Sequence, residues 1–243
     1  MPAGTDRAVC KDNANKKTLC GFAWEHFESI DSTNNYAKAL ARQGFSRVAV
    51  TADGQTGGRG RNGRVFCSEK GAGLYLSVVL PAEECDLLTI RAAVAVAEAI
   101  EELTGADAGI KWVNDIFVGG KKVCGILAEG VGGKAVLGIG VNLKKQEFPE
   151  ELQYIAGDLE TLTGVIVPPE VMAEAILSRL ESLKEPLEAY RKRCFVLGKE
   201  VTVFRGEEIF GATALRILDD GGLVVLRSGK EETLRSGEVS VRV

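Results

Sequence analysis

Apolar side chains recur along this chain at two spacings, and the longer spacing predicts helices. Residues 90–103 place apolar side chains on one helical face, with Asp86 positioned to cap the start and Gly105 to end the helix. A second helical pattern covers residues 168–190. Pro186 lies inside that pattern and should kink the helix or end it early, because proline lacks the backbone N–H.

Shorter apolar runs bounded by turn residues predict strands. Gly-Gly and Asn-Asp turns separate several of them, a hairpin-like rhythm that favours antiparallel or mixed pairing over repeated βαβ units. A short helix is expected over residues 31–41, because residues 31–34 offer several N-cap side chains. The predicted strands of this part of the chain cover residues 22–30, 47–52, 73–80, 110–112, 116–118, 123–131 and 135–143.

The pattern changes after residue 197. Short strands alternate with tight turns at 219–222 and 228–230, which is typical of a small β-barrel of SH3-like size. We therefore predict an α+β fold with a mixed, largely antiparallel central sheet, flanking helices and a small C-terminal SH3-like β-barrel. The predicted strands here cover residues 200–204, 213–218, 223–227 and 239–243. The predicted divisions are a poorly ordered extension at 1–20, a main domain at 21–193 and the small domain at 194–243.

Composition narrows the classes of function. The net charge of -4 argues against a duplex DNA binder, and the first twenty residues lack the apolar stretch of a secretory signal. No apolar run approaches the roughly 18 residues of a membrane-spanning helix, so we expect a cytoplasmic protein without membrane or nucleic-acid partners. A single histidine, His26, excludes histidine-rich metal sites, and six cysteines without a C-x-x-C pair favour reduced thiols.

The most informative stretch is residues 53–64, DGQTGGRGRNGR. Its five glycines let backbone amides approach an anion closely. Its arginines Arg59, Arg61 and Arg64 can add bidentate contacts to phosphate or carboxylate. Because the glycines reduce the rigidity of the segment and the arginines concentrate positive charge, we interpret it as a mobile anion clamp that orders on its ligand.

Other interpretations of this loop are possible, including a flexible loop without function. The spacing Gly58-x-Gly60-x-x-Gly63 matches a dinucleotide fingerprint, but the residues after it do not continue as the required helix. A kinase glycine-rich loop would need V-A-I-K and H-R-D segments, which are absent. An RGG-like RNA-binding segment normally belongs to a disordered tail rather than between strands.

Two further segments carry candidate chemistry. After residues 111–115 (KWVND), Lys122 leads into an apolar strand containing Gly125, from which its ammonium can reach a pocket. The alternative for the Asn-Asp pair is an ordinary hairpin turn. Residues 138–142 (GIGVN) place two glycines inside a strand. Either a ligand ring lies against their backbone, or the strand has a bulge or tight protein packing there.

Taken together and in this order, these segments resemble the catalytic core of biotin–protein ligases. The resemblance covers about residues 22–243 and implies a fold like that of class II synthetases and biotin–lipoate ligases. It is closest to the shorter class that lacks an N-terminal DNA-binding domain, so no repressor activity is expected. The matching segments are 32–34, Gln55, 58–64, 111–115, 122–129, 138–142 and 237–239.

The resemblance implies an ATP-dependent enzyme that converts biotin to biotinyl-5'-AMP and then transfers biotin to a lysine of a biotin carboxyl carrier protein or domain. Mg²⁺ is expected on the departing pyrophosphate, and a homodimer is expected from the family. Lys122, with Arg59 and Arg61, would neutralise charge as the biotin carboxylate attacks the α-phosphorus. Asp115 is the candidate that assists the acceptor lysine, which is mostly protonated at neutral pH.

The resemblance also assigns binding residues. For biotin they are Ser32, Thr33, Asn34, Gln55, Gly58, Arg59, Gly60, Arg61, Lys122, Gly125, Gly138 and Gly140. For ATP they are Arg59, Arg61, Lys111, Trp112, Asn114, Lys122 and Asn142. Two positions depart from the family pattern, since Val113 stands where proline is common and Asn62 where arginine is frequent.

The sequence leaves two alternative functions open, a lipoate–protein ligase and a non-catalytic RNA-binding protein. A lipoate–protein ligase shares the fold and the acyl-adenylate chemistry, although the glycine-arginine loop with residues 111–115 favours biotin. A non-catalytic RNA-binding protein would show salt-dependent RNA binding and no ATP consumption.

Overall fold

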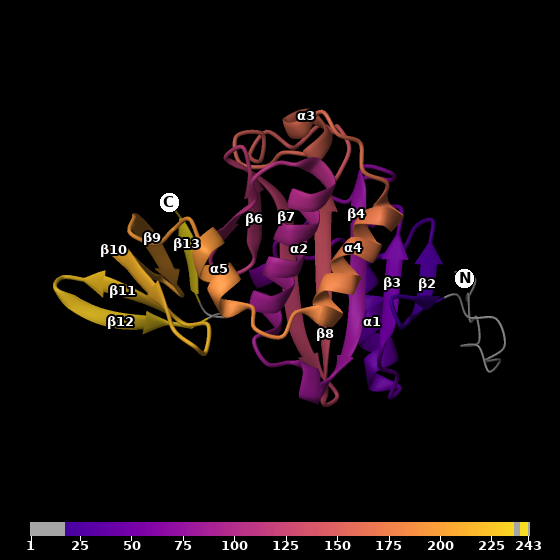
Figure 1. Cartoon of the computed structure of the whole chain (residues 1–243), viewed down its shortest axis with the longest axis horizontal. Helices are drawn as coiled ribbons and strands as arrows, with labels where there is room; N and C mark the ends of the chain where they lie inside the picture. Colours follow the sequence, from indigo (N-terminus) through magenta and orange to yellow (C-terminus); the bar gives the residue numbers. More distant parts are fainter. Residues whose placement is uncertain (1–17, 236–238, 243) are drawn as a thin grey trace.

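The computed structural model describes residues 18–235 and 239–242, and its centre is an eight-stranded sheet (Figure 1). The strand order is β1-β2-β3-β4-β8-β7-β6-β5; β2 and β3 are parallel and the other neighbouring pairs antiparallel. The predicted mixed, largely antiparallel sheet is therefore confirmed. Its strands are β1 (Thr18–Leu19), β2 (Phe22–Phe27), β3 (Val48–Ala52), β4 (Gly73–Pro81), β5 (Gly109–Lys111), β6 (Asp115–Val118), β7 (Lys121–Val131) and β8 (Lys134–Asn142). The helices are α1 (Thr33–Arg42), α2 (Leu88–Thr104), α3 (Leu159–Thr163), α4 (Pro169–Ser182) and α5 (Leu187–Arg193), with short 3-10 turns at Arg61–Gly63 and Ala82–Glu84.

Helices cover the two faces of this sheet unequally. Successive strand side chains point to opposite faces. Val50 of β3 and Val136 of β8 pack in the smaller cluster with α1, whereas Ala49 and Leu137 belong to the larger cluster with α2 and α4. Figure 1 shows α2 and α4 lying side by side across the face of the sheet that carries the larger hydrophobic cluster. The α1 face is left partly uncovered, and the site lies there.

One helix boundary differs from the sequence prediction, and the predicted break near Pro186 is confirmed. Asp86 does not cap α2: the helix starts one residue later than that cap would require, after Leu87, whose φ of 49° is left-handed. That turn of the backbone carries Leu88 into the core, where it is 5% exposed. The second predicted helix ends at Ser182, and a new helix, α5, begins directly after Pro186, as expected where proline removes an amide donor.

A second, smaller sheet follows α5 and is antiparallel throughout, in the order β12-β11-β10-β9-β13. The predicted small β domain is confirmed, but β12 was missed: the turn predicted at 228–230 is shorter, and Lys230 already begins a strand. The predicted boundaries at 20 and 193 stay predictions. Residues 1–17 of the extension and 237–238 of the family match lie outside the described residues. The strands are β9 (Glu200–Arg205), β10 (Glu208–Ile217), β11 (Leu223–Arg227), β12 (Lys230–Leu234) and β13 (Val239–Arg242).

Buried contacts fix the small sheet against the main one. The Trp112 indole N–H donates to the Gly221 carbonyl at 3.0 Å, and the Arg191 guanidinium donates to the Ile217 carbonyl at 2.9 Å. Val203 of β9 belongs to the same core cluster as α2. The second sheet thus helps to fix the position of Trp112, which lies in the turn between β5 and β6.

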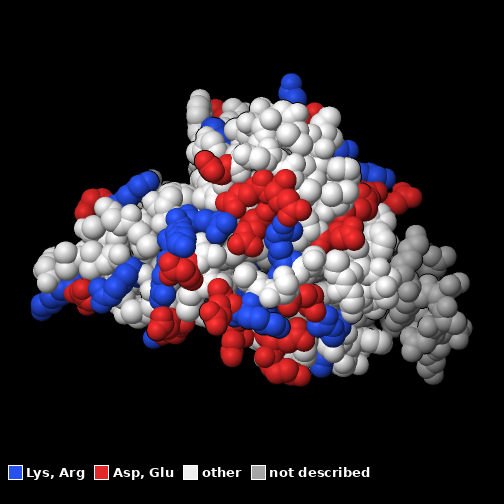
Figure 2. Space-filling view, in the orientation of Figure 1, with Lys and Arg blue, Asp and Glu red and all other residues white. Residues whose placement is uncertain are grey.

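The face seen in Figure 2 carries basic and acidic side chains interspersed over α2, α4 and α5. Several form ion pairs, among them Arg193–Glu101 at 2.7 Å and Arg47–Glu181 at 2.6 Å. Among the described residues, none of the helices has the length and apolar character of a membrane span. The five described cysteines are free thiols, in agreement with the prediction of reduced thiols.

Candidate active site

A cavity of about 860 Å³ opens on the α1 face of the central sheet. Even-numbered residues of β8 share this face, because side chains alternate along a strand. Val136 lies beneath α1, while Gly138, Gly140 and Asn142 line the cavity beyond it. From Gly138 to Asn142 is roughly 13 Å along the strand, so the cavity is elongated.

Neutral hydrogen-bonding groups from the start of α1 form one end of the cavity. The Thr33 amide and hydroxyl both donate to Gln55 Oε1, at 2.8 and 3.0 Å. Ser77 Oγ on β4 lies 2.6 Å from Asn34 Oδ1 and 2.8 Å from Thr33 Oγ1. Ser32 Oγ accepts from the Asn35 amide as the N-cap, so the cap is one of the several candidates at residues 31–34. Almost no water reaches these groups, since Ser32, Thr33 and Asn34 are buried.

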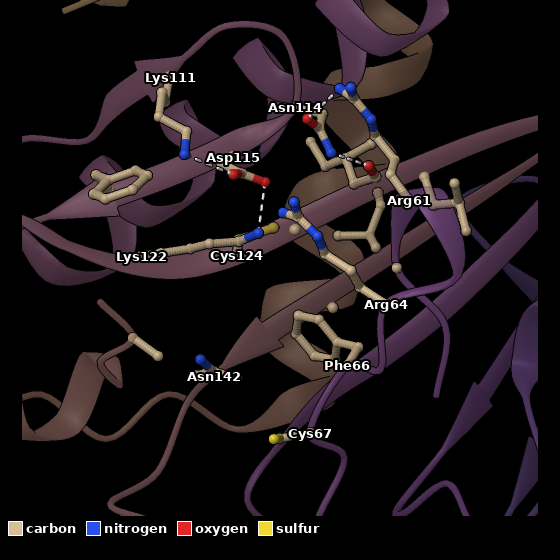
Figure 3. Close-up of a pocket in the computed structure, with 18 of the residues that line it drawn as sticks. Arg61, Arg64, Phe66, Cys67, Lys111, Asn114, Asp115, Lys122, Cys124 and Asn142 are labelled. Carbon is tan, nitrogen blue, oxygen red and sulfur yellow. Dashed lines mark hydrogen bonds and ion pairs between the residues drawn. The ribbon is translucent and has the colours of Figure 1, made fainter. Parts of the chain in front are cut away.

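A carboxylate shared by two lysines lies farther along the cavity (Figure 3). Lys122 Nζ is 2.6 Å from Asp115 Oδ1, and Lys111 Nζ is 3.3 Å from Asp115 Oδ2. Burial raises the pKa of the Asp115 carboxyl, but the two ammonium groups outweigh burial and the net pKa is lowered. Burial lowers the pKa of Lys111, and Asp115 opposes that shift. The cluster therefore holds one more positive than negative charge.

The glycine- and arginine-rich segment folds back on itself beside this cluster. The Phe66 amide donates to the Gly58 carbonyl at 3.1 Å, and the Gly60 amide donates to the Arg64 carbonyl at 2.7 Å. This short hairpin carries Arg61 toward the turn after β5, where its guanidinium donates to Asn114 Oδ1 at 2.8 Å (Figure 3). Arg59 and Arg64 are exposed at the rim of the cavity.

The turn that carries Asn114 is held from two further directions. Asn114 Nδ2 donates to the Ile126 carbonyl at 2.6 Å, and the buried Tyr190 hydroxyl of α5 donates to the Val113 carbonyl at 3.2 Å. Burial is the main cause that lowers the pKa of Arg61, while Asp115 opposes the shift. Asn114 is thus a fixed anchor for Arg61 rather than a free hairpin side chain.

The strand glycines accommodate protein side chains. A Cβ at Gly140 would lie 2.5 Å from the Phe66 ring, and a Cβ at Gly138 would lie 2.2 Å from Asn34 Oδ1. Phe66 also lies 3.4 Å from the Cβ position at Gly125, beside the Lys122 side chain. The side chains of Asn34 and Phe66 therefore pack tightly against the backbone of Gly138 and Gly140.

Aromatic and basic residues that the sequence interpretation missed complete the cavity. Phe117 and Phe195 meet edge to face with ring centroids 5.3 Å apart, and Lys111 and Lys199 lie over their outer faces. Phe66 has a sequence signal, because it lies two residues after the end of the arginine-rich segment. Phe195 and Lys199 come from beyond α5, where no sequence pattern points to the cavity.

Of the predicted site residues, all but Gly58 line this one cavity. Gly58 lies behind the loop, where a Cβ would meet the Phe66 carbonyl at 2.4 Å. Trp112 lines the wall, although it is 2% exposed and its N–H is used by Gly221. Six basic and two acidic side chains line the cavity, so the site favours an anion. These are Arg59, Arg61, Arg64, Lys111, Lys122 and Lys199 against Asp107 and Asp115.

The described residues contain no group of three or more potential metal ligands. A magnesium ion needs fewer from the protein, because it is commonly held by one or two carboxylates together with substrate phosphates and water. Asp115 is a partly buried, ionised carboxylate that faces the cavity, so it fits that requirement.

Comparisons with known proteins agree with this geometry. Residues 26–145 match the Biotin/lipoate A/B protein ligase family. The "Biotin--[acetyl-CoA-carboxylase] ligase" of Mycobacterium tuberculosis is 30% identical over 97% of this chain and 98% of its own length. The chain belongs to the biotin protein ligase family. Its family membership explains why the predicted segments, distant in sequence, meet in one cavity.

One further sequence and one solved structure show how much of this chain is similar to known proteins. The "Bifunctional ligase/repressor BirA" of Bacillus subtilis is 39% identical over 151 residues, which are 57% of this chain but 46% of that protein. The chain therefore matches less than half the length of this relative. The structure of the biotin protein ligase from Aquifex aeolicus in complex with biotin and ATP has a TM-score of 0.81, with 30% identity, over 90% of this chain and 98% of the other.

Proposed function

We propose that this protein is an ATP-dependent biotin–protein ligase that forms biotinyl-5'-AMP and then transfers biotin to a lysine of a carrier protein. One observation carries the proposal: a single elongated cavity joins a neutral hydrogen-bonding end to a cationic end. Biotin has the same two parts, a neutral ring with N–H and C=O groups and a carboxylate on an apolar chain.

The neutral end supports biotin over lipoate. Thr33 and Asn34 present buried hydroxyl and amide groups, and Gln55 adds a partly buried amide. The dithiolane ring of lipoate has no N–H or C=O with which to match them, and a buried polar site rejects a ligand that leaves its groups unpaired. The ring of Phe66, over Gly125 and Gly140, gives an apolar wall where the side chain of biotin would pass.

The cationic end supports adenylate formation. In the first step a carboxylate oxygen of biotin forms a bond to the α-phosphorus of ATP, and the bond from that phosphorus to the pyrophosphate oxygen breaks. Carboxylate and polyphosphate repel each other. Lys122 and Arg61 provide fixed positive charge in a partly dehydrated site where electrostatic stabilisation is strong, and Arg59 adds a further cation from the rim. Lys111, Trp112, Asn114 and Asn142 are the proposed contacts of the nucleotide.

Asp115 has two proposed roles. It orients Lys122 and Lys111, and with the phosphates of ATP it would hold Mg²⁺, which supplies further positive charge against the pyrophosphate. In the second step the acceptor amine attacks the carbonyl carbon, AMP leaves, and the amine loses a proton. The ionised Asp115 carboxylate would attract the acceptor ammonium, but its lowered pKa makes it a weak base.

The carrier domain of a biotin-dependent carboxylase is the proposed acceptor, because the Mycobacterium tuberculosis relative is named for acetyl-CoA-carboxylase. A cytoplasmic location, a homodimer and the absence of a nucleic-acid partner stay predictions from the sequence.

Titration calorimetry with biotin and, separately, with lipoate tests the choice of acid. Heat with biotin and none with lipoate is the expected result; the reverse would replace biotin by lipoate. Incubation with biotin, ATP, Mg²⁺ and a carboxylase carrier domain should then add one biotinyl group to that domain by mass spectrometry. A carrier domain of unchanged mass would contradict the proposed transfer step.

A further inference from the structure

A chain of hydrogen bonds runs from an ion pair beside α1 to the neutral end of the cavity. Lys38 Nζ donates to Glu129 Oε1 at 3.0 Å, and Asn34 Nδ2 donates to Glu129 Oε2 at 3.1 Å. The other side of the same amide, Asn34 Oδ1, accepts from Ser77 Oγ at 2.6 Å. Glu129 lies at the end of the family segment 122–129, and nothing in the proposed mechanism uses it.

Glu129 fixes which way the Asn34 amide faces. An ionised carboxylate only accepts hydrogen bonds, so Asn34 must turn its NH₂ toward Glu129 and its oxygen toward Ser77. Lys38 stabilises the carboxylate in this place, and both partners are partly buried, with side chains 14% and 32% exposed. Gly138 allows the amide to lie flat against β8.

The Thr33 and Ser77 hydroxyl groups have two hydrogens between them, but their oxygens make three close oxygen–oxygen contacts. Three close O···O contacts link Gln55 Oε1, Thr33 Oγ1, Ser77 Oγ and Asn34 Oδ1 in a row. The Gln55 amide cannot reverse, because its oxygen also accepts from the Thr33 backbone N–H and its NH₂ donates to Ser68 at 2.9 Å. Both ends of the row are therefore acceptors, and two hydroxyl hydrogens serve three contacts.

This end of the cavity thus has a surplus of acceptors, which suits a ligand that donates N–H. We propose that Glu129 is a positioning residue for biotin: it holds the Asn34 amide with its oxygen toward the Ser77–Thr33 pair, and so preserves the acceptor surplus that receives the ring N–H groups. The proposal rests on the proposed function and deepens it.

The substitution Glu129→Gln reverses the pattern without changing the size of the side chain. Lys38 can only donate, so the oxygen of the introduced amide stays with Lys38 and its NH₂ faces Asn34. The Asn34 amide must then turn over and present NH₂ to Ser77, which removes one acceptor from the row. We expect the KM for biotin in adenylate formation to rise about tenfold, the effect of one hydrogen bond, while kcat stays within about twofold because no cation has moved.

The double substitution Asn34→Asp with Glu129→Gln provides a rescue that a merely structural role would not give. The introduced carboxylate on α1 offers one oxygen to Ser77 and its second oxygen to the NH₂ of the introduced amide on β7, and the total charge equals that of the native protein. The KM for biotin should return to within about threefold of native. Glu231→Gln is the matched control, because Glu231 pairs with Arg216 at 2.6 Å on the second sheet, and it should leave both constants unchanged.

An unchanged KM in Glu129→Gln, or a KM that stays tenfold high in the double variant, would overturn the proposal. Thermal melting of each variant identifies one that does not fold; if Glu129→Gln is that variant, the KM of the double variant decides alone. Absence of adenylate formation by the native protein would instead contradict the proposed function, so the two failures are distinguishable.

Discussion

Gly138→Ala is predicted to damage both the stability of the fold and the neutral end of the site. The added Cβ would lie 2.2 Å from Asn34 Oδ1 and 2.8 Å from Asn34 Cγ, so the amide must leave its place on β8. It would then lose its hydrogen bonds to Ser77 and to the Glu129 carboxylate. A neutral hydrogen bond contributes about 1 kcal/mol and one to a charged group about 1.5–3 kcal/mol, so we expect the free energy of unfolding to fall by about 2.5–4 kcal/mol.

Urea denaturation and the KM for biotin are the measurements. Gly130→Ala is the matched control, because Gly130 is an exposed glycine in β7 with no atom within 4 Å of the added Cβ. The control should change the free energy of unfolding by less than about 0.5 kcal/mol and should not change KM. If Gly138→Ala behaved like Gly130→Ala in both assays, the account of Asn34 as a tightly placed binding residue would be refuted.

The other predictions concern the wall, the domain junction and the shared carboxylate. Gly140→Ala should push the Phe66 ring into the cavity, raising the KM for biotin about tenfold and lowering the free energy of unfolding by about 1–3 kcal/mol; an unchanged KM would contradict the packing. Trp112→Phe removes the hydrogen bond to Gly221 and should lower the free energy of unfolding by about 1–2 kcal/mol, measured in urea, whereas equal stability would show the junction does not depend on it. The pKa of Asp115 is lowered from its ordinary value of 3.8, so its ion pairs stabilise the fold above that pH, and this contribution is lost as pH falls through the lower folded-state pKa. Acid titration should therefore show the stability difference between native protein and Asp115→Asn shrinking below pH 3.8; a difference that grew there would reverse the sign of the argument.

Local sequence patterns predict a helix end correctly where the side chains at that end determine it. The terminator Gly105 is confirmed, and the N-cap of α1 falls within the predicted residues 31–34, since each acts on its own helix end. Asp86 failed as a cap because the core position of Leu88, a long-range effect, sets where α2 begins. Lys230 was read as part of a turn because its short strand is polar and is defined by pairing with β11.

In the site, too, the sequence identifies individual residues, whereas the contacts between distant segments come only from the structure. Lys122 and Asp115 were named from their segments, and the β6–β7 pairing brings them together. The glycines in β8 were noticed, but only the structure shows that Asn34 and Phe66 occupy the space above them. Lys199 could not be predicted, because its approach to the cavity depends on how the second sheet packs.

We expect this cavity to form biotinyl-5'-AMP, with Lys122 stabilising the reacting anions. The direct test is a single-turnover reaction with biotin, labelled ATP and Mg²⁺ without an acceptor, comparing the native protein with Lys122→Ala and with the exposed-lysine control Lys230→Ala. We expect biotinyl-5'-AMP and pyrophosphate from the native protein and the control, and a rate at least about 100-fold lower from Lys122→Ala. Equal rates from native and Lys122→Ala, or no adenylate from the folded native protein, would contradict the account.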